Sequence, residues 1–252
     1  KFGDDSTRTI KSPSHKYASA GTYTVWLIAT TNNGCSDSIS KNVTVYPLPN
    51  VSFSAANSCL SNAVSFTNNS SIASGYSISS YSWDFGDGKT SVSKSPVYTY
   101  AAAGTYAVKL IVTSNKGCKD SISKSITIYP QPQVSFAASD ACQGDYLSIS
   151  NSSSISSGKI NSFLWKFGDG TSSTDSLPVK SYTKPGKYTL WLMATSNFGC
   201  SDSTSQSITI FSRTNVSFSF QNHCHDSSIS FTNTSSGTIA SVAWRFGDGA
   251  TS

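Results

Sequence analysis

Short segments of the chain alternate apolar with small polar residues, and turn-forming residues separate them. In residues 48–130 these segments are Val51–Ala55, Ala63–Thr67, Tyr81–Phe85, Pro96–Tyr100, Tyr106–Val112 and Ile122–Ile128. A period of two residues is typical of half-buried β-strands, which point alternate side chains toward a core. The pattern predicts about seven short strands with a turn roughly every ten residues, and therefore an all-β fold of antiparallel β-sandwich type.

A sharp turn that follows the third of these segments returns along the chain. Phe85-Gly86-Asp87-Gly88 recurs at 167–170 and 246–249, and the variant Phe-Gly-Asp-Asp opens the chain at 2–5. Glycine permits a positive φ, and an Asp side chain can accept hydrogen bonds from nearby backbone N–H groups. We therefore predict structural turns at Gly86, Asp87, Gly88, Gly168, Asp169, Gly170, Gly247, Asp248 and Gly249. Asp5 replaces the second glycine, which leaves the type of the first turn open.

The turns recur at intervals of about 80 residues, which indicates an array of small repeated domains. We predict, in order, a C-terminal half-domain, two complete domains and an N-terminal half-domain, at residues 1–47, 48–130, 131–212 and 213–252. The two halves indicate a segment of a longer array; the alternative is that they complete each other between subunits, as in strand donation. Spaced prolines in Tyr46–Pro49 and Tyr129–Pro132 are expected to stiffen the connections.

The composition excludes several classes of function. Only 12% of the residues are charged, and the net charge of +5 is spread without a block of Lys or Arg, so we expect no nucleic-acid partner. No apolar run reaches the roughly 18 residues of a membrane span, so we expect no membrane insertion in this segment. No set of Ser, His and Asp recurs with the period, and we predict neither an enzyme nor a cofactor.

Two groups of residues carry side chains of metal-ligand type. The turn carboxylates of Asp87, Asp169 and Asp248 are candidates for Ca²⁺, but Ca²⁺ takes six or more oxygen ligands and each turn offers one or two carboxylates. We therefore favour the structural interpretation of these turns. The sequence His-Cys-His-Asp at 223–226 occurs in one copy only, and its Cys belongs to a periodic position, so we expect no metal site there.

The ordered motifs carry a family resemblance. Trp-Asp-Phe-Gly-Asp-Gly, then Pro-x-x-x-Tyr-x-x-x-Gly-x-Tyr-x-Val-x-Leu, then Asn-x-Gly, resembles the polycystic kidney disease (PKD) domain, and the resemblance extends over essentially the whole chain. It implies immunoglobulin-like sandwiches, extracellular and non-catalytic, in an extended tandem array. Tandem copies with a Cys after Asn-x-Gly look like those in giant surface proteins of Bacteroidota, some of them used for adhesion or gliding.

This resemblance implies a structural segment of an extracellular or cell-surface filament, stalk or adhesin, from a bacterium. The alternative is a carbohydrate- or protein-binding accessory module of a secreted multidomain protein. The expected partners are neighbouring PKD domains of the same chain, other copies in a filament, and surface glycans.

The six cysteines occupy two positions of the repeat: Cys35, Cys118 and Cys200 open the last strand, and Cys59, Cys142 and Cys224 follow the first. An even, periodic set in a surface-type protein predicts disulfides rather than metal sites. The possible pairings are Cys59–Cys118 with Cys142–Cys200 inside domains, three pairs across linkers (Cys35–Cys59, Cys118–Cys142, Cys200–Cys224), and Cys59–Cys200.

Strand direction favours one of these pairings. In a sandwich the first strand ends, and the last strand starts, at opposite ends, roughly 26 Å apart for strands of about eight residues. A disulfide needs Cα atoms within about 7 Å. The interdomain bond Cys59–Cys200 is therefore favoured, and Cys118 and Cys142 would then pair with domains outside the chain. The intradomain pairs stay the alternative if the first strand is short or bent.

Other side chains are candidates for contacts or modification. Trp83, Trp165 and Trp244 hold equivalent strand positions and are expected in the cores. Trp26 and Trp191 share a position with Lys109 and face outward, where they could contact a sugar or a neighbouring domain, or be covered by long side chains. Ser38, Ser121 and Ser203 follow Asp in a pattern that resembles Bacteroidota O-glycosylation acceptors; the alternative is ordinary strand residues.

Overall fold

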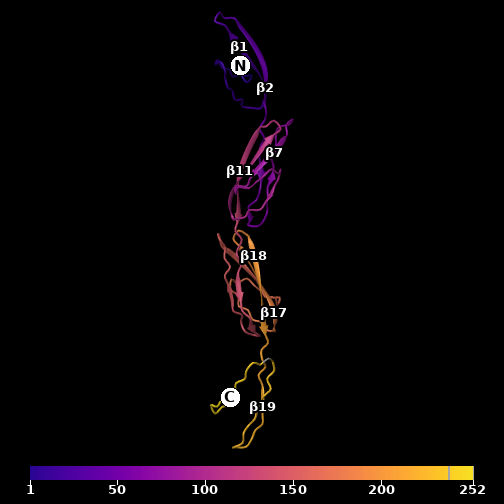
Figure 1. The fold of residues 1–252 in the computed structure, drawn as a ribbon, viewed down its shortest axis with the longest axis vertical. Coiled ribbons are helices and arrows are strands. Elements are labelled where there is room, and N and C mark those ends of the chain that lie inside the picture. The colour runs from indigo at the N-terminus through magenta and orange to yellow at the C-terminus, as the bar shows by residue number, and fades with distance from the viewer. Residues whose placement is uncertain (238, 252) are drawn as a thin grey trace. The chain divides into compact units, whose positions relative to one another are not determined.

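The computed structural model describes residues 1–237 and 239–251, and every regular element among them is a β-strand. The chain divides into two compact units, Lys1–Tyr129 and Pro130–Ser252 (Figure 1). Each unit contains one five-stranded sheet with its own buried core. We call the parts with these sheets module 1 (residues 48–129) and module 2 (residues 130–211), and the flanking parts the N-terminal and C-terminal segments. The all-β fold predicted from the alternating pattern is confirmed.

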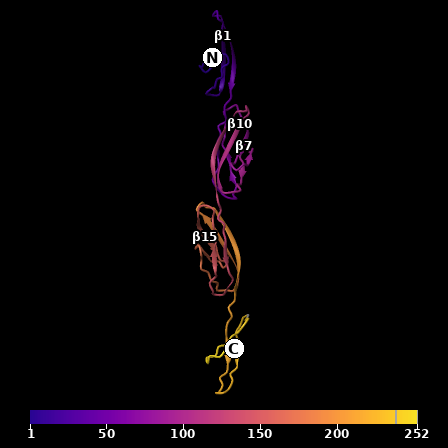
Figure 2. The same ribbon diagram turned by 60° about the vertical axis from the view of Figure 1, so that its left-hand side comes forward.

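Module 1 combines a five-stranded sheet, in the order β4-β11-β10-β7-β8, with the strand pairs β3–β6 and β5–β9. Its strands are β3 (Phe53–Ser54), β4 (Ser58–Cys59), β5 (Val64–Ser65), β6 (Thr67–Asn68), β7 (Ile78–Asp84), β8 (Thr90–Ser91), β9 (Val97–Tyr98), β10 (Gly104–Ser114) and β11 (Lys119–Tyr129). Strands β7 and β10 pair antiparallel and lie side by side in Figure 2, and β10 pairs on its other edge with β11.

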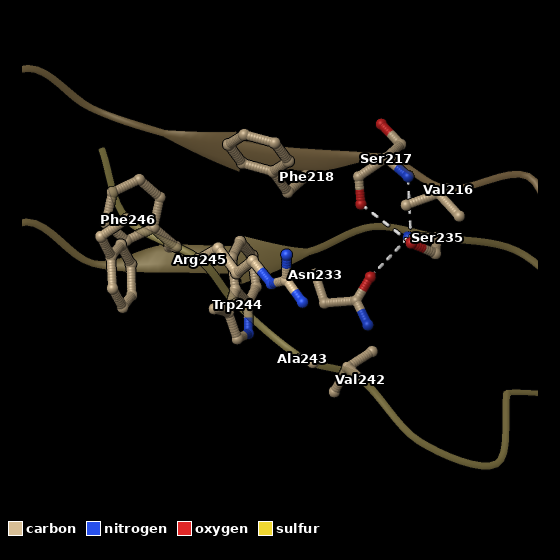
Figure 3. Close-up of a pocket in the computed structure, with 11 residues that line it drawn as sticks. Val216, Ser217, Phe218, Asn233, Ser235, Val242, Ala243, Trp244, Arg245 and Phe246 are labelled. Atoms are coloured by element: carbon tan, nitrogen blue, oxygen red, sulfur yellow. Dashed lines mark hydrogen bonds between the residues drawn. The ribbon is translucent and has the colours of Figure 1, made fainter. Parts of the chain in front are cut away.

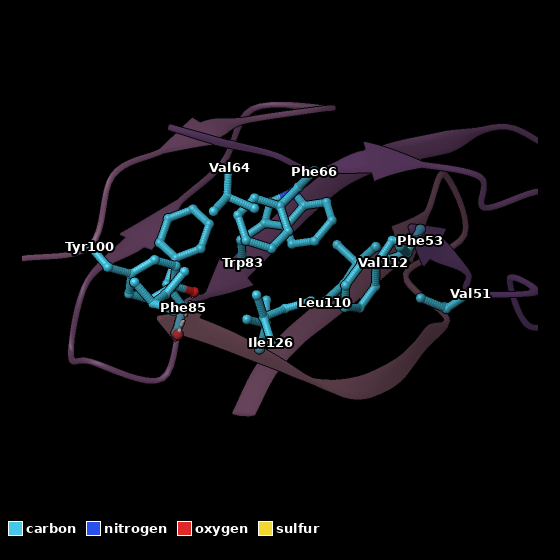
Figure 4. Close-up of a cluster of buried hydrophobic side chains, with 12 residues drawn as sticks. Val51, Phe53, Val64, Phe66, Trp83, Phe85, Tyr100, Leu110, Val112 and Ile126 are labelled. Atoms are coloured by element: carbon cyan, nitrogen blue, oxygen red, sulfur yellow. Dashed lines mark hydrogen bonds between the residues drawn. The ribbon is translucent and has the colours of Figure 1, made fainter. Parts of the chain in front are cut away.

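The alternation in β10 produces the core of module 1. Val108, Leu110 and Val112 are each 0% exposed, and the residues between them are at least partly exposed. These three side chains belong to one buried cluster with Trp83 of the neighbouring strand β7 and with Phe53 of the β3–β6 pair (Figure 4). Burying an apolar side chain of this size contributes about 1.5–3 kcal/mol relative to leaving it exposed, so this cluster is the main source of stability.

Module 2 repeats the arrangement, with the sheet order β13-β18-β17-β15-β16 and the pair β12–β14. Its strands are β12 (Phe136–Ala138), β13 (Ala141–Cys142), β14 (Ile149–Asn151), β15 (Ile160–Lys166), β16 (Ser172–Ser173), β17 (Gly186–Ser196) and β18 (Ser201–Phe211). Several core positions differ in size, and at one of them Ile149 stands where module 1 has the buried Phe66. A hollow of about 390 Å³ lies beside Ile149, Phe163 and Leu177.

The two flanking segments contain the corresponding parts of a module. In the N-terminal segment β1 (Gly21–Thr30) and β2 (Ser36–Val45) form a hairpin that starts at the pair Gly21–Val45, as β10 and β11 start at Gly104–Ile128. In the C-terminal segment β19 (Phe218–Phe220) and β20 (Phe231–Asn233) pair in the register of β3 and β6.

One strand pairing was not predicted. Strand β4 runs parallel to the end of β11, with Cys59 opposite Tyr129, whereas strictly alternating strand directions would give antiparallel neighbours throughout. The Asn57 side chain accepts a hydrogen bond from the Thr127 N–H at 2.8 Å, and the Leu60 N–H donates to the Tyr129 carbonyl at 2.8 Å. These bonds hold a short segment after β3 against the edge of the large sheet. Module 2 has the equivalent parallel pair β13–β18.

Candidate functional site

The recurrent turn is closed in every copy by the same backbone hydrogen bond, from the Phe N–H to the carbonyl four residues later. The distances are 3.0 Å for Phe2, 3.0 Å for Phe85, 3.1 Å for Phe167 and 2.9 Å for Phe246. At Gly86 φ is +83°, and a Cβ there would lie 2.9 Å from the Ala107 carbonyl oxygen of β10. At Gly88 φ is +84° and the surrounding space is open. The first glycine is therefore required by close packing, and the second by backbone conformation alone.

The departure at Asp5 leaves the turn type unchanged. Asp5 adopts a φ of +64°, in the same left-handed region as Gly88. Asp tolerates this region better than most residues with a side chain, because its short polar side chain can bond locally. The first turn thus keeps the geometry of the others without its second glycine.

Each turn Asp uses one carboxylate oxygen to hold the turn. Oδ1 of Asp87 accepts the Lys89 N–H at 3.1 Å, and Oδ1 of Asp169 accepts the Thr171 N–H at 3.0 Å. Asp248 and Asp4 make the same bond two residues along the chain, at 2.9 and 3.2 Å. The predicted role of the Asp as an acceptor within the turn agrees with this geometry.

The second carboxylate oxygen accepts a hydrogen bond from a side chain eleven residues further along the chain. The donor differs in each copy: His15 Nε2 lies 2.6 Å from Asp4, Tyr98 OH 2.7 Å from Asp87, and Lys180 Nζ 2.5 Å from Asp169. We call these pairs the turn latch. In the sequence this position varies between copies, so its role was missed. The constant spacing of eleven residues from the turn Asp to a side chain with a polar hydrogen could have revealed it.

The latch side chains also cover the Phe of the turn. The His15 ring stacks on Phe2 at 4.3 Å between centroids, and Tyr98 stacks on Phe85 at 4.2 Å. In module 2 Lys180 places its Nζ 5.1 Å from the centroid of the Phe167 ring. Three chemically different residues therefore make the same two contacts, one to the carboxylate and one to the ring face.

The latches shift the pKa values of the groups that they join. Hydrogen bonds from Ser6 and then His15 lower the pKa of Asp4 to about 2. Burial on its own would raise the pKa of Asp169, but hydrogen bonds from Lys180 and Thr171 outweigh it and lower that pKa to about 2. The hydrogen bond to Asp87, with some burial, raises the pKa of Tyr98 to about 12.

A buried tyrosine anchors each turn to the rest of its module. The Tyr100 hydroxyl donates to the Phe85 carbonyl at 3.0 Å, and Tyr182 donates to the Phe167 carbonyl at 2.6 Å. Both tyrosines are 2% exposed, and burial raises the pKa of both hydroxyls. In the N-terminal segment the Tyr17 hydroxyl makes the same bond to Phe2 at 2.9 Å.

Two of the three tryptophans expected in cores are buried, whereas Trp244, on the C-terminal segment, is partly exposed. Trp83 and Trp165 are 0% exposed, and their indole N–H groups donate to the carbonyls of Ser93 and Asp175. Trp191 lies between the buried Leu190 and Leu192 in β17 and therefore points out of the sheet. The Nζ atom of Lys166 lies 5.0 Å from its ring centroid, so a long side chain covers part of this ring. Trp26 is 44% exposed.

The described residues offer a poor donor set for a metal ion. No three His, Cys, Asp or Glu side chains gather among residues 1–237 and 239–251. Both carboxylate oxygens of Asp87 already accept hydrogen bonds, and Ca²⁺ takes six or more oxygen ligands. His225 Nδ1 lies 3.1 Å from Asp226 Oδ2 on the C-terminal segment, and both side chains are exposed.

The six cysteines fall into two groups. Cys59 and Cys200 are disulfide-bonded, whereas Cys35, Cys118, Cys142 and Cys224 carry free thiols. The alternative pairs Cys59–Cys118 and Cys142–Cys200 are thus absent. The reason is geometric in module 1: Cys59 lies opposite Tyr129 at the end of β11, and Cys118 precedes the start of that strand, about 35 Å away at 3.4 Å per residue.

The three candidate acceptor serines, Ser38, Ser121 and Ser203, are exposed on the last strand of their repeats. Their backbone N–H groups donate to the preceding Asp side chains at 2.7, 2.8 and 2.8 Å. O-glycosylation at these sites stays a prediction, which sugar mass on the Ser121 peptide would test.

A hollow of about 280 Å³ lies on the C-terminal segment (Figure 3). Phe218, Trp244 and Phe246 contribute to its lining, and they hold the positions of Phe53, Trp83 and Phe85. In module 1 those positions are buried against β10 and β11. The hollow is therefore the inner face of a sandwich layer rather than a shaped ligand site.

No described helix is long and apolar enough to cross a membrane.

Comparison with known proteins places these features in a family. The model of the PKD domain matches residues 1–47, 45–130 and 128–211. The chain is 35% identical over 103 residues to the pre-pro-metalloprotease PrtV of Vibrio cholerae serotype O1, which covers 40% of this chain and 11% of that protein. It is 45% identical over 51 residues to collagenase ColQ1 of Bacillus cereus, covering 20% of this chain and 5% of that protein. The chain thus spans a small share of these relatives.

Two solved structures of single domains are also similar. The PKD1 domain of the Vibrio cholerae metalloprotease PrtV is 38% identical and matches 33% of this chain and 99% of its own length, with a TM-score of 0.30. The PKD1 domain of Vibrio anguillarum Epp is 32% identical and matches 32% of this chain and 93% of its own, also with a TM-score of 0.30. Because the family model matches three successive segments that include both five-stranded sheets, the chain belongs to the PKD domain family.

Proposed function

We propose that this chain is a non-catalytic structural segment of an extracellular or cell-surface bacterial protein, such as a filament, stalk or adhesin. The proposal rests on a comparison of the copies: positions that build the module recur, and outward positions vary. The buried Trp, the closed turn, its latch and the anchoring Tyr recur, and all of them build the module. The outward position in the long strand holds Trp26, Lys109 and Trp191 in turn. A surface that bound one ligand in every copy would need matching side chains there.

The relatives support an accessory rather than a catalytic role. The chain matches about a tenth or less of proteins named as a metalloprotease and a collagenase, and the matched PrtV structure is that of a PKD domain. For this chain we infer the same kind of role, a module that holds other parts of a secreted multidomain protein in place.

We propose further that Cys59 and Cys200 bond to each other. Cys59 lies at the end of module 1 where the chain leaves, opposite the last residue of β11. Cys200 directly precedes β18 and so lies at the end of module 2 opposite to its own exit. Each position therefore faces the connection between the modules. With the prolines of that connection, the bond would restrict bending and keep successive modules in line.

Peptide mapping without reduction tests this bond. The expected result is a single linked pair of peptides that contain Cys59 and Cys200, lost after reduction and in Cys59→Ser but kept in Cys142→Ser. A link between Cys59 and Cys118 would overturn the proposal.

Electron microscopy of the native protein before and after reduction tests the structural role. Long regular fibres with a repeat near one domain length, which become more flexible on reduction, are expected. Short, isolated and flexible rods in both conditions would contradict a load-bearing role.

The second candidate function is glycan binding, and the outward position of Trp191 beside Lys166 favours it. An aromatic ring at a surface can stack on a sugar ring, and a nearby Lys suits an acidic sugar. A glycan array decides this alternative. It is probed with the unmodified chain, with Trp191→Ala, and with Lys109→Ala as the control at the equivalent position of module 1. Binding lost only in Trp191→Ala would favour it over the structural role.

A further inference from the structure

The connection between the N-terminal segment and module 1 contains an aromatic contact. Tyr46 directly follows β2, and its ring meets the Tyr76 ring edge-on, with 6.0 Å between centroids. The Nζ atom of Lys116 lies 5.5 Å from the centroid of the Tyr46 ring. Tyr46 is 40% exposed, and its neighbour Leu48 in the same linker is 62% exposed. The last aromatic side chain before the prolines is thus held by two side chains of the following module.

The two holding side chains come from loops at one end of module 1. Tyr76 precedes β7, and Lys116 belongs to the tight turn between β10 and β11. The loops are tied together, because the Asn115 N–H donates to the Ser77 carbonyl at 2.8 Å. A cation close to an aromatic face, together with an edge-on ring, gives an attractive and directional contact. Tyr46 therefore lies against a prepared surface, which we call the aromatic socket (Tyr76 and Lys116).

Module 2 has the same loops with the residues exchanged. The Asn197 N–H donates to the Lys159 carbonyl at 3.0 Å, so Gly158 and Phe198 stand at the positions of Tyr76 and Lys116. A Cβ at Gly158 would lie 2.5 Å from the Phe198 ring, so this ring occupies the space beside the glycine. The two loops again present one aromatic ring. In module 2 the ring comes from the turn between β17 and β18, whereas in module 1 it comes from the loop before β7.

The residue that would dock also recurs. An aromatic side chain ends the last strand of each repeat, or directly follows it, at Tyr46, Tyr129 and Phe211. We propose that the socket is a docking surface for the aromatic side chain at the end of the preceding module, and that this contact orders the linker between modules. The proposal rests on the proposed structural role, because it supplies the stiffness that such a role needs.

Amide order parameters of the linker in the full 252-residue chain test the proposal. Pro47 and Pro49 lack an N–H group, and Asn50 is held by its own backbone hydrogen bonds to Ser71, so Leu48 is the reporter and Asn50 the ordered reference. In the unmodified chain the order parameter of Leu48 is expected near the rigid value of about 0.85, and in Tyr46→Ala below about 0.6, because the linker then loses its side-chain contact, while Asn50 stays unchanged. Tyr76→Ala should give the same fall.

Leu48→Ala is the matched control, since Leu48 belongs to the same linker and is more exposed than Tyr46. Unchanged order parameters in Tyr46→Ala, or an equal fall in Leu48→Ala, would overturn the docking role. A binding module could still have an ordered linker, so electron microscopy and the glycan array test the proposed function independently of this result.

Discussion

The two glycines of the recurrent turn should differ sharply in their tolerance of a side chain. Gly86→Ala and Gly88→Ala both place a Cβ at a φ above +80°, which costs about 1–2 kcal/mol in the left-handed region. Only at Gly86 does the new Cβ also meet the backbone of Ala107, at 2.9 Å. This overlap forces the turn away from β10 and adds about 1–3 kcal/mol, as overpacking does. The expected total is about 2–5 kcal/mol at Gly86 and about 1–2 kcal/mol at Gly88.

Native-state hydrogen exchange of the full chain measures these costs module by module. Amides of β10 report on module 1, and amides of β17 in the same sample serve as the unaltered internal reference. Gly88→Asp is the matched variant, because Asp5 already occupies this position in the first copy at a φ of +64°; it should cost less than Gly88→Ala. Equal costs for Gly86→Ala and Gly88→Ala would refute the view that close approach to Ala107 fixes the first glycine.

Three further variants probe the anchor, the latch and the core. Tyr100→Phe leaves the buried Phe85 carbonyl without its hydrogen bond and should destabilise module 1 by about 1–3 kcal/mol, measured by hydrogen exchange; a cost near zero would contradict the anchoring role. The pKa of Asp169 falls from 3.8 to about 2 on folding, so its contribution is complete above pH 4 and is lost as the pH falls toward 2. Acid titration of module 2 should show this loss, and Lys180→Met should reduce it. Ile149→Phe should fill the adjacent hollow and stabilise module 2 by about 0.5–2 kcal/mol, with a raised Tm as the readout; destabilisation would show that the hollow is too open to accept the ring.

The sequence was sufficient for the long strands, the turns and the cores, because these depend on periodic burial and on glycine. It did not reveal β4, since a two-residue strand has no period and its pairing with β11 depends on the side chain of Asn57. The latch was missed for another reason. His15, Tyr98 and Lys180 share no residue class, and only the geometry shows that each reaches the same carboxylate oxygen.

The cysteines show a similar limit. Periodicity predicts that all six belong to one scheme, but it does not say which thiols are bonded within this chain. Cys118 and Cys142 recur with the same regularity as Cys59 and Cys200, and yet carry free thiols. Pairing depends on which ends of a module the thiols occupy: strand direction predicts the exit end for Cys59, and the unpredicted β4 holds it there opposite Tyr129.

The parallel pair of β4 and β11 has a mechanical consequence. The chain enters module 1 through β3 and leaves directly after Tyr129, so with the proposed Cys59–Cys200 bond reduced a pull on the two ends draws β4 and β11 in opposite directions along their length. The hydrogen bond from Leu60 to Tyr129 and the bond from Thr127 to Asn57 are then loaded in shear and must break together. In module 2 the bonds from Gln143 to Phe211 and from Thr209 to Asp140 are placed in the same way. After reduction the edge strand therefore acts as a clamp across the ends of each module, which tension must break before the core can open, whereas the intact Cys59–Cys200 bond would carry the tension past both clamps.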